Sequence, residues 1–242
     1  MGKRNIVVTG GSSGIGRAVA ARFAADGADV VVTGRRRDAL LAAARDIGAR
    51  AVVCDAADPA AVEAALDQFP ERIDVLVNNA GANTDRSRPD AHDLHGLAAN
   101  WQANLSANLM SAVLTTTALS DRLITGGSVV LVGSIAADRG SGGGSYGAAK
   151  AALAAWNVDQ SAELGARGIT SNVVSPGFVA DTAFFGDRLN DERRAALRAA
   201  TRNKREGRPS DIAETVFFLA SSGARHITGQ VINVNGGAVT TR

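Results

Sequence analysis

Short apolar runs rich in valine and isoleucine alternate with alanine-rich stretches along almost the whole chain. The apolar runs are not interleaved with polar residues, which indicates strands that are buried on both faces. Such strands, separated by helical stretches, are typical of a parallel sheet, and right-handed crossovers place the helices on both of its faces. The sequence therefore predicts a doubly wound α/β fold. We expect its seven parallel strands at residues 6–8, 30–33, 51–54, 75–77, 129–132, 170–174 and 231–234.

The stretches between these runs have the composition of helices, and Asp58-Pro59 and Ser210-Asp211 are typical helix starts. No repeat or linker interrupts the pattern, so we expect residues 1–242 to form one domain. Three stretches rich in glycine and polar residues follow the carboxyl ends of predicted strands, where ligands bind in such sheets. These stretches are residues 82–96, 138–145 and 178–190. The expected helices are 14–26, 38–47, 59–68, 97–119, 145–165, 190–201 and 210–221.

The composition excludes several classes of protein. A hydrophobic fraction of 45% is too high for a disordered chain. No stretch approaches the ~18 consecutive apolar residues of a membrane span, so we expect no membrane association. The net charge is only +2, and no basic run is interleaved with aromatic residues, so nucleic acid is not an expected partner. Cys54 is the single cysteine and cannot form an internal disulfide, which is consistent with a cytoplasmic protein.

A glycine-rich turn directly follows the first predicted strand. Residues 9–16 read Thr-Gly-Gly-Ser-Ser-Gly-Ile-Gly, and a helical stretch begins within them. A tight turn without Cβ atoms lets backbone N–H groups and the helix N-terminus face a pyrophosphate. A P-loop is excluded because Gly16 is followed by Arg17-Ala18 instead of Lys-Ser or Lys-Thr. The turn therefore predicts a dinucleotide site.

Tyr146 is the only tyrosine in the chain, and Lys150 is one of only three lysines among 26 cationic residues. The two residues are four apart, so on a helix their side chains lie on one face. A phenol titrates near pH ~10, and a neighbouring positive charge lets it act as an acid or base near neutral pH. Arginine is the usual cation of this chain, so a lysine at this position indicates that a compact charge is needed. Tyr146 and Lys150 are therefore the candidate catalytic pair.

Several motifs together resemble those of the short-chain dehydrogenase/reductase family. They occur in the family's order and cover nearly the whole chain, and they end with residues 233–237, Asn-Val-Asn-Gly-Gly. Within the family, the chain is most similar to 3-oxoacyl-(acyl-carrier-protein) reductases and polyketide ketoreductases. The resemblance implies a single-domain Rossmann fold and a homotetramer, or alternatively a homodimer. The motifs are Thr9-x-x-x-x-Gly14-x-Gly16, Asn78-Asn79-Ala80-Gly81, Ser134, Tyr146-Gly147-Ala148-Ala149-Lys150 and Pro176-Gly177.

The resemblance also implies a reaction, in which a nicotinamide cofactor transfers hydride to a carbonyl carbon. Tyr146 would donate a proton to the carbonyl oxygen, and Ser134 would hydrogen-bond the same oxygen. Lys150 would lower the pKa of Tyr146 and bind the nicotinamide ribose. By resemblance, Asn108 matches the family asparagine whose helix kink holds a water that links Lys150 to solvent. Asn104 is the competing choice for this role, and its offset from the preceding tryptophan fits less well.

The second predicted strand bears on which nicotinamide cofactor is used. It ends in Arg35-Arg36-Arg37, without the carboxylate that NAD enzymes use to bind the ribose 2′-hydroxyl. Guanidinium groups suit the 2′-phosphate of NADP, so we expect NADP, with Arg35 as the main contact; NAD stays open. By resemblance, Asp55 accepts from the adenine amino group and Thr182 holds the carboxamide. The expected cofactor positions are Gly10, Ser12, Ser13, Gly14, Ile15, Gly16, Arg35, Arg36, Asp55, Ala56, Asn78, Ala80, Gly81, Tyr146, Lys150, Pro176, Gly177, Val179 and Thr182.

The substrate is expected to lie under a covering segment at about residues 178–205, where Phe184-Phe185 favours an apolar molecule. A carrier-bound substrate would need a basic docking patch, for which the sequence offers only Arg122 and Arg167. These observations favour a small ketone or a polyketide, and a carrier-bound substrate stays open. The alternatives are an oxidising alcohol or sugar dehydrogenase and a non-catalytic NADP-binding regulator. No metal site is expected, because residues 92–95 lack a second ligand cluster.

Overall fold

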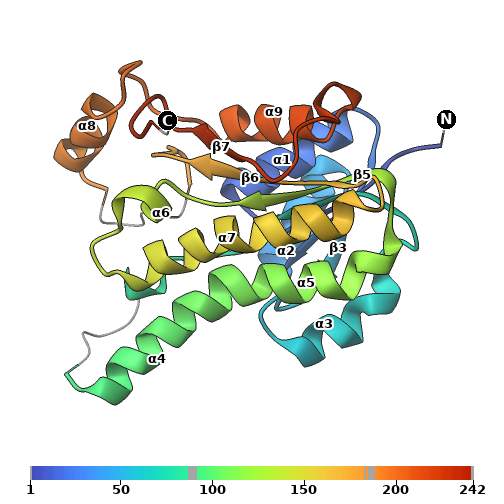
Figure 1. The fold of residues 1–242 in the computed structure, drawn as a ribbon, viewed down its shortest axis with the longest axis horizontal. Helices are drawn as coiled ribbons and strands as arrows, with labels where there is room; N and C mark the ends of the chain where they lie inside the picture. Colours follow the sequence, from blue (N-terminus) through green and yellow to red (C-terminus); the bar gives the residue numbers. More distant parts are fainter. Residues whose placement is uncertain (1, 87–91, 183, 185–188, 241–242) are drawn as a thin grey trace.

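The computed structural model describes residues 2–86, 92–182, 184 and 189–240. The described residues form a seven-stranded, wholly parallel sheet with the order β3-β2-β1-β4-β5-β6-β7 (Figure 1). The predicted doubly wound α/β fold with a single domain is therefore confirmed. The strands are β1 (Asn5–Thr9), β2 (Asp29–Gly34), β3 (Arg50–Val53), β4 (Ile73–Asn78), β5 (Leu123–Val132), β6 (Thr170–Pro176) and β7 (Val231–Val234).

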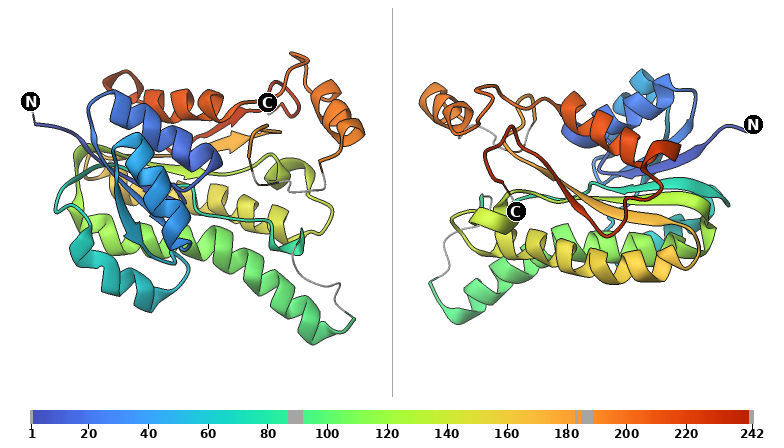
Figure 2. Two further views of the ribbon diagram at one scale, coloured as in Figure 1. Left: turned by 180° about the vertical axis from the view of Figure 1, so that it is seen from behind. Right: turned by 45° about the horizontal axis from the view of Figure 1, so that its top comes forward.

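Helices cover both faces of the sheet, as Figures 1 and 2 show. On one face α1, α2 and α9 bury a core that includes Phe23, Leu40 and Ile212. On the other face α3, α5 and α7 bury a second core that includes Leu119 and Leu153. The helices of the described residues are α1 (Gly14–Ala25), α2 (Arg37–Ile47), α3 (Pro59–Ala65), α4 (Leu94–Leu105), α5 (Ser111–Leu119), α6 (Ala136–Arg139), α7 (Ser145–Gly165), α8 (Asp191–Ala199) and α9 (Pro209–Leu219).

The two edge strands differ from the expectation that all seven strands are buried on both faces. Val53 in β3 and Val231 in β7 are each 39% exposed. Both strands lie at an edge of the sheet, with a neighbouring strand on one side only. An apolar run in the sequence does not distinguish an edge strand from a central one, and this is why the prediction was wrong there.

The predicted helix 97–119 is interrupted. The structure forms α4 and α5 with a turn of π-helix, Ser106–Met110, between them. The helix also begins three residues earlier than expected, at Leu94. Asp93 caps this start by accepting a hydrogen bond from the backbone N–H of Gly96 at 2.7 Å. A π-turn inserts one extra residue into the helical repeat, and such turns occur often at functional sites.

The helix starts expected at Asp58 and Ser210 are close to the observed ones. Asp58 caps α3 by accepting from the N–H of Ala60 at 3.0 Å. The last helix, α9, begins one residue earlier than expected, at Pro209, and Asp211 accepts from the N–H of Arg208 at 2.7 Å. In the described part of the chain, no helix combines the length and the apolar character needed to cross a bilayer.

Candidate active site

A cavity of about 990 Å³ opens at the carboxyl ends of the strands, where β1 and β4 lie side by side and the order of the strands reverses. The three stretches rich in glycine and polar residues also follow the carboxyl ends of strands in the sequence. The cavity brings together residues from eight segments of the chain. Of the predicted site residues, Gly10, Ser12, Ser13, Gly14, Ile15, Arg35, Arg36, Asp55, Ala56, Ala80, Gly81, Asn108, Ser134, Tyr146, Lys150, Pro176, Gly177, Val179 and Thr182 line it.

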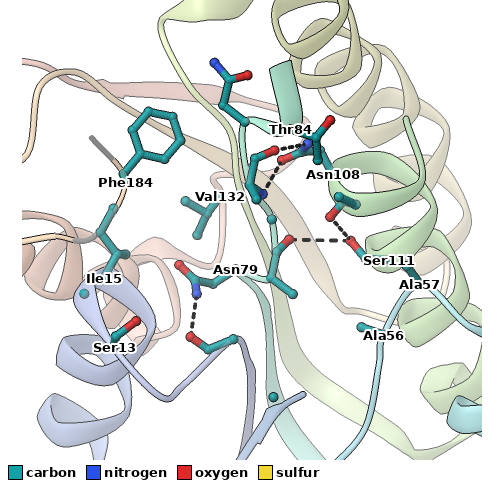
Figure 3. Close-up of a pocket in the computed structure, with 18 of the residues that line it drawn as sticks. Ser13, Ile15, Ala56, Ala57, Asn79, Thr84, Asn108, Ser111, Val132 and Phe184 are labelled. Carbon is teal, nitrogen blue, oxygen red and sulfur yellow. Dashed lines mark hydrogen bonds between the residues drawn. The ribbon is translucent and has the colours of Figure 1, made fainter. Parts of the chain in front are cut away.

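The glycine-rich turn is tied to the end of β4 by hydrogen bonds. Thr9 Oγ1 accepts from the backbone N–H groups of Asn79 and Ala80, each at 3.0 Å. Asn79 Nδ2 donates to the carbonyl oxygens of Thr9 and Gly10 at 3.0 and 3.1 Å, and Figure 3 shows this side chain reaching the turn. The sequence motifs contained both residues, but the resemblance assigned no role to Asn79.

Gly16 does not line the cavity, although it was predicted to be a cofactor position. A Cβ atom at this residue would lie 2.4 Å from both Asn79 Nδ2 and the carbonyl oxygen of Gly10. Gly16, the last glycine of the motif, therefore lets helix α1 approach the turn closely and shapes the cavity without lining it.

Asn78 does not line the cavity either. Its side chain is buried and donates from Nδ2 to Thr116 Oγ1 in α5 at 2.8 Å. Successive side chains of a strand point to opposite sides, so a strand end with two consecutive asparagines places only one of them at the cavity. The structure places Asn79 there.

The N-terminus of α1 opens into the cavity. Ser13 is the N-cap, its side chain makes no capping hydrogen bond, and the first turn of α1 contains no acidic residue. Ser13 and Ile15 lie across the hollow from Asn108 and Ser111 (Figure 3). Free N–H groups and the positive end of the helix dipole suit a phosphate at this position.

Arg35 and Asp55 lie at one end of the cavity and form a loose ion pair, with 3.7 Å between Nη1 and Oδ2. The Arg35 side chain is 70% exposed, so it can reorient toward a ligand at little cost. Asp55 Oδ1 accepts from the N–H of Ala57 at 3.1 Å, which fixes the carboxylate beside the cavity. This end of the cavity therefore contains both predicted groups, Arg35 for the 2′-phosphate and Asp55 for the adenine amino group.

Tyr146 and Lys150 lie in the first two turns of α7, and both are buried. Lys150 Nζ donates to the carbonyl oxygen of Val132 at 2.8 Å and lies 6.0 Å from the centre of the Tyr146 ring. Burial lowers the pKa of Lys150 from its usual 10.5 to about 8, because the surroundings disfavour the charged form. The Tyr146 ring also contacts the ring of Phe184, at 5.6 Å between centroids. The neighbouring Phe185 lies outside the described residues, as do parts of the expected covering segment 178–205.

The π-turn directs Asn108 into the cavity. Asn108 Nδ2 donates to the carbonyl oxygen of Ala82 at 2.7 Å, and its Oδ1 accepts from the N–H of Ala82 at 3.2 Å. A Cβ atom on Gly81 would lie 2.6 Å from Asn108 Oδ1 and 3.3 Å from Lys150 Nζ, so these two side chains converge over Gly81. The alternative residue, Asn104, does not line this cavity.

Two hydroxyl groups complete the predicted set. Ser134 Oγ accepts from the N–H of Ala136 at 3.1 Å and lines the cavity beside Tyr146. Thr182 Oγ1 donates to the carbonyl oxygen of Val179 at 3.1 Å. A Cβ atom on Gly14 would lie 3.3 Å from the Thr182 methyl group, so Thr182 lies over the glycine-rich turn.

Several lining residues were not predicted from the sequence, among them Asn79, Thr84, Ser111 and Val132. The contribution of Val132 is a backbone carbonyl, which no sequence motif can reveal. Ser111 follows the π-turn and is oriented by it. Among the residues that the structure describes, no group of three or more histidine, cysteine or acidic side chains is arranged to hold a metal ion.

Comparisons with known proteins show which proteins this chain is similar to. A family model described as enoyl-(acyl carrier protein) reductase matches residues 10–239. The 3-oxoacyl-(acyl-carrier-protein) reductase of Escherichia coli K12 is 35% identical over 240 residues, covering 96% of this chain and 95% of that protein. A short-chain dehydrogenase/reductase of Brucella melitensis, described as a glucose/ribitol dehydrogenase, has a TM-score of 0.88 at 32% identity and covers 98% and 97% of the two chains. A short chain dehydrogenase of Burkholderia cenocepacia J2315, solved in complex with NADP, has a TM-score of 0.84 at 36% identity and covers 98% and 97%.

Proposed function

The chain belongs to the short-chain dehydrogenase/reductase family, and we propose that it is an NADPH-dependent reductase that converts a ketone into a secondary alcohol. The observation that carries this proposal is the meeting of Asn108, Ser134, Tyr146 and Lys150 in one cavity with the glycine-rich turn. A protein that only sensed the nucleotide would need the turn and would have no use for a buried acid and its lysine.

The shape and the donor groups of the cavity fit NADPH. The N-terminus of α1 suits the pyrophosphate, and Arg35 and Arg36, which directly follow β2, suit the 2′-phosphate. A solved relative from Burkholderia cenocepacia binds NADP, which supports the same preference. When bound, NADPH supplies the hydride that reduces the carbonyl carbon.

The residues of the chain supply the proton and hold the carbonyl group. Ser134 Oγ and the Tyr146 hydroxyl hydrogen-bond the carbonyl oxygen, and Tyr146 donates its proton to that oxygen as charge develops there. The positive charge of Lys150 stabilises the tyrosinate that remains. Asn108 lies in the π-turn next to Lys150. It binds the water through which a proton returns from solvent to Lys150.

A small ketone fits the structure better than a substrate on a carrier protein. Arg122 Nη1 donates to the carbonyl oxygens of Leu66 and Phe69 at 2.9 and 3.1 Å. Arg167 Nη2 donates to the carbonyl oxygens of Ser120 and Leu123, each at 2.9 Å. Both arginines therefore hold backbone together near the start of β5, away from the edge where the cavity opens.

The test is a panel of ketones and alcohols with each reduced or oxidised cofactor, followed by the absorbance of the reduced nicotinamide. We expect NADPH-dependent reduction, and Tyr146→Phe should lower kcat by at least about a thousandfold while leaving the Kd for NADPH within about threefold. Retained activity of Tyr146→Phe would show that another group is the acid.

Other outcomes of the panel would overturn the proposal in defined ways. Turnover confined to alcohols with NADP⁺ or NAD⁺ would indicate an oxidising dehydrogenase. Tight NADPH binding without turnover on any substrate would indicate a regulator. The homotetramer and the cytoplasmic location implied at the level of sequence stay predictions, and sedimentation analysis tests the first.

A further inference from the structure

A second, smaller cavity adjoins the proposed catalytic residues. Its volume is about 340 Å³, and it shares Ser134, Tyr146 and Phe184 with the nucleotide cavity. Residues of α6 and α8 line this cavity. Both helices lie at the end of the molecule where the strands have their carboxyl ends (Figure 1). A ketone whose oxygen is held by Ser134 and Tyr146 therefore extends into this space.

The second cavity has a mixed lining, in which apolar side chains and two arginines stand beside the hydroxyl groups of Ser134 and Tyr146. Ile135, Phe178 and Leu197 provide apolar surface. Arg139 and Arg193 are the charged residues among the described lining residues, and no carboxylate lines the cavity in that part of the chain. Two uncompensated positive charges beside a small apolar space favour a ligand with an apolar body and an anionic end.

Neither arginine has an acidic partner among the described residues, in contrast to Arg194 and Arg205. On the same helix as Arg193, Arg194 makes a bidentate pair with Glu206, with both distances 2.7 Å. Arg205 pairs with Asp211 at 2.7 and 2.9 Å. Within the described part of the chain, the guanidinium groups of Arg139 and Arg193 make no ion pair.

The placement of Arg193 follows from the helix period. Arg193 and Leu197 are four residues apart in α8, so both side chains lie on the face that the helix turns toward the cavity, whereas Arg194 and Arg198 do not line it. Arg139 is the last residue of α6, at the edge of the glycine-rich stretch that closes the other side.

We propose that the substrate is an oxo acid, whose carboxylate is bound by Arg139 and Arg193 while its ketone lies at Ser134 and Tyr146. This inference rests on the proposed ketone reduction and adds the substrate class. Guanidinium groups bind carboxylates through two parallel N–H···O bonds, and they stay charged at every pH at which the enzyme is active. The side chains of Ile135, Phe178 and Leu197 contact the carbon chain between the ketone and the carboxylate.

The test compares oxo acids of increasing chain length with their methyl esters, using NADPH and the wild-type chain. We expect kcat/KM for the best oxo acid to exceed that for its ester by at least about tenfold. Arg139→Ala and Arg193→Ala should each lower kcat/KM for the acid about tenfold and leave the value for the ester unchanged. Arg198→Ala, on the same helix but away from the cavity, is the matched control and should change neither value.

A binding experiment separates this inference from the proposed reaction. Isothermal titration of the NADP⁺ complex with a saturated carboxylic acid of the preferred length should show binding that is lost in the Arg139→Ala, Arg193→Ala double variant. Equal kcat/KM values for acids and esters would overturn the oxo-acid assignment and leave ketone reduction standing. A preference for phosphorylated ketones over oxo acids would also overturn it. Binding of the saturated acid without reduction of any ketone would instead count against the proposed reaction.

Discussion

Lys150 holds an ammonium group where little water can reach it. The residue is 5% exposed, and its Nζ donates to the carbonyl oxygen of Val132 at 2.8 Å. A single carbonyl replaces only part of the hydration that the charge has in water, so burial lowers the pKa to about 8. The cost of this buried charge is a stability effect that depends on pH.

We predict that the free energy of unfolding contributed by Lys150 rises between about pH 7 and about pH 9.5. The folded pKa, about 8, lies below the ordinary value of 10.5, so the unfolded chain binds more protons across this interval and raising the pH favours the folded state. The expected gain is about 2 kcal/mol. Urea unfolding of the wild type and of Lys150→Met at both pH values measures it, since other titrating groups are common to both proteins. Parallel pH dependences of the two proteins would contradict the buried charge.

Gly81 permits the approach of Asn108 to Lys150. A Cβ atom at Gly81 would lie 2.6 Å from Asn108 Oδ1, closer than real contacts allow. We expect Gly81→Ala to lower kcat at least about tenfold by displacing one of the two side chains, because misplacement of about 1 Å in a catalytic set costs rate. Steady-state kinetics and NADPH binding measure the effect.

Gly165→Ala is the control, because nothing lies within 4 Å of a Cβ atom at that end of α7. This variant should keep full activity and unfold at equal or slightly higher temperature, since alanine favours a helix over glycine. Equal activity of Gly81→Ala and the wild type would show that the convergence over Gly81 is unimportant.

At the scale of elements, α4 and α5 with the π-turn between them carry two asparagines with separate tasks. Asn108 faces the cavity, and Asn104 is fully buried one turn earlier. Asn104 Nδ2 donates to Asp85 Oδ1 at 2.6 Å and to Ser145 Oγ at 2.7 Å, and its Oδ1 accepts from the N–H of Thr84 at 3.1 Å. Asn104 therefore joins α4 to the loop after β4 and to the first residue of α7.

We predict that Asn104→Ala lowers the free energy of unfolding by about 2–3 kcal/mol, because it leaves buried partners without a hydrogen bond. It should also lower kcat more than it changes KM, since Ser145 directly precedes Tyr146. Chemical denaturation and steady-state kinetics measure the two effects. Gln102→Ala, on the exposed face of the same helix, is the control. If Gln102→Ala lowers the free energy of unfolding as much as Asn104→Ala does, the hydrogen bonds of Asn104 are not the cause of the loss.

The residue pattern predicted one helix over residues 97–119, and only the family resemblance implied a kink at Asn108; neither predicted a π-turn. The π-turn is stabilised by tertiary contacts, above all the pair of hydrogen bonds between the Asn108 amide and the backbone of Ala82. Those contacts form between segments that are 26 residues apart. Helical periodicity reports local pattern only, so it cannot show where one extra residue enters the repeat.

At the scale of the whole molecule, the alternation of strands and helices was sufficient to predict the sheet and the end of its strands at which the cavity opens. It was not sufficient to predict which strands lie at the edges, because that depends on strand order, β3-β2-β1-β4-β5-β6-β7. The same order explains why the cavity collects residues so distant in sequence. The chain reverses direction across the sheet between β1 and β4, and the loops after both strands open there.

The walls of the cavity come from both halves of the sheet, so a nucleotide bound there would stabilise the entire domain. We predict that NADPH at about 100 times its Kd stabilises the folded chain by about 2.7 kcal/mol, which raises Tm by about 5–10 °C for a domain of this size. NADH at the same concentration should raise Tm less, because it lacks the 2′-phosphate that we propose Arg35 binds. Thermal unfolding with each cofactor measures the difference. Arg35→Ser should remove most of the difference between the two cofactors, whereas Arg45→Ser, on the exposed surface of α2, should preserve it. A larger shift with NADH than with NADPH would reverse the assignment of the cofactor and leave the fold of the site unchanged.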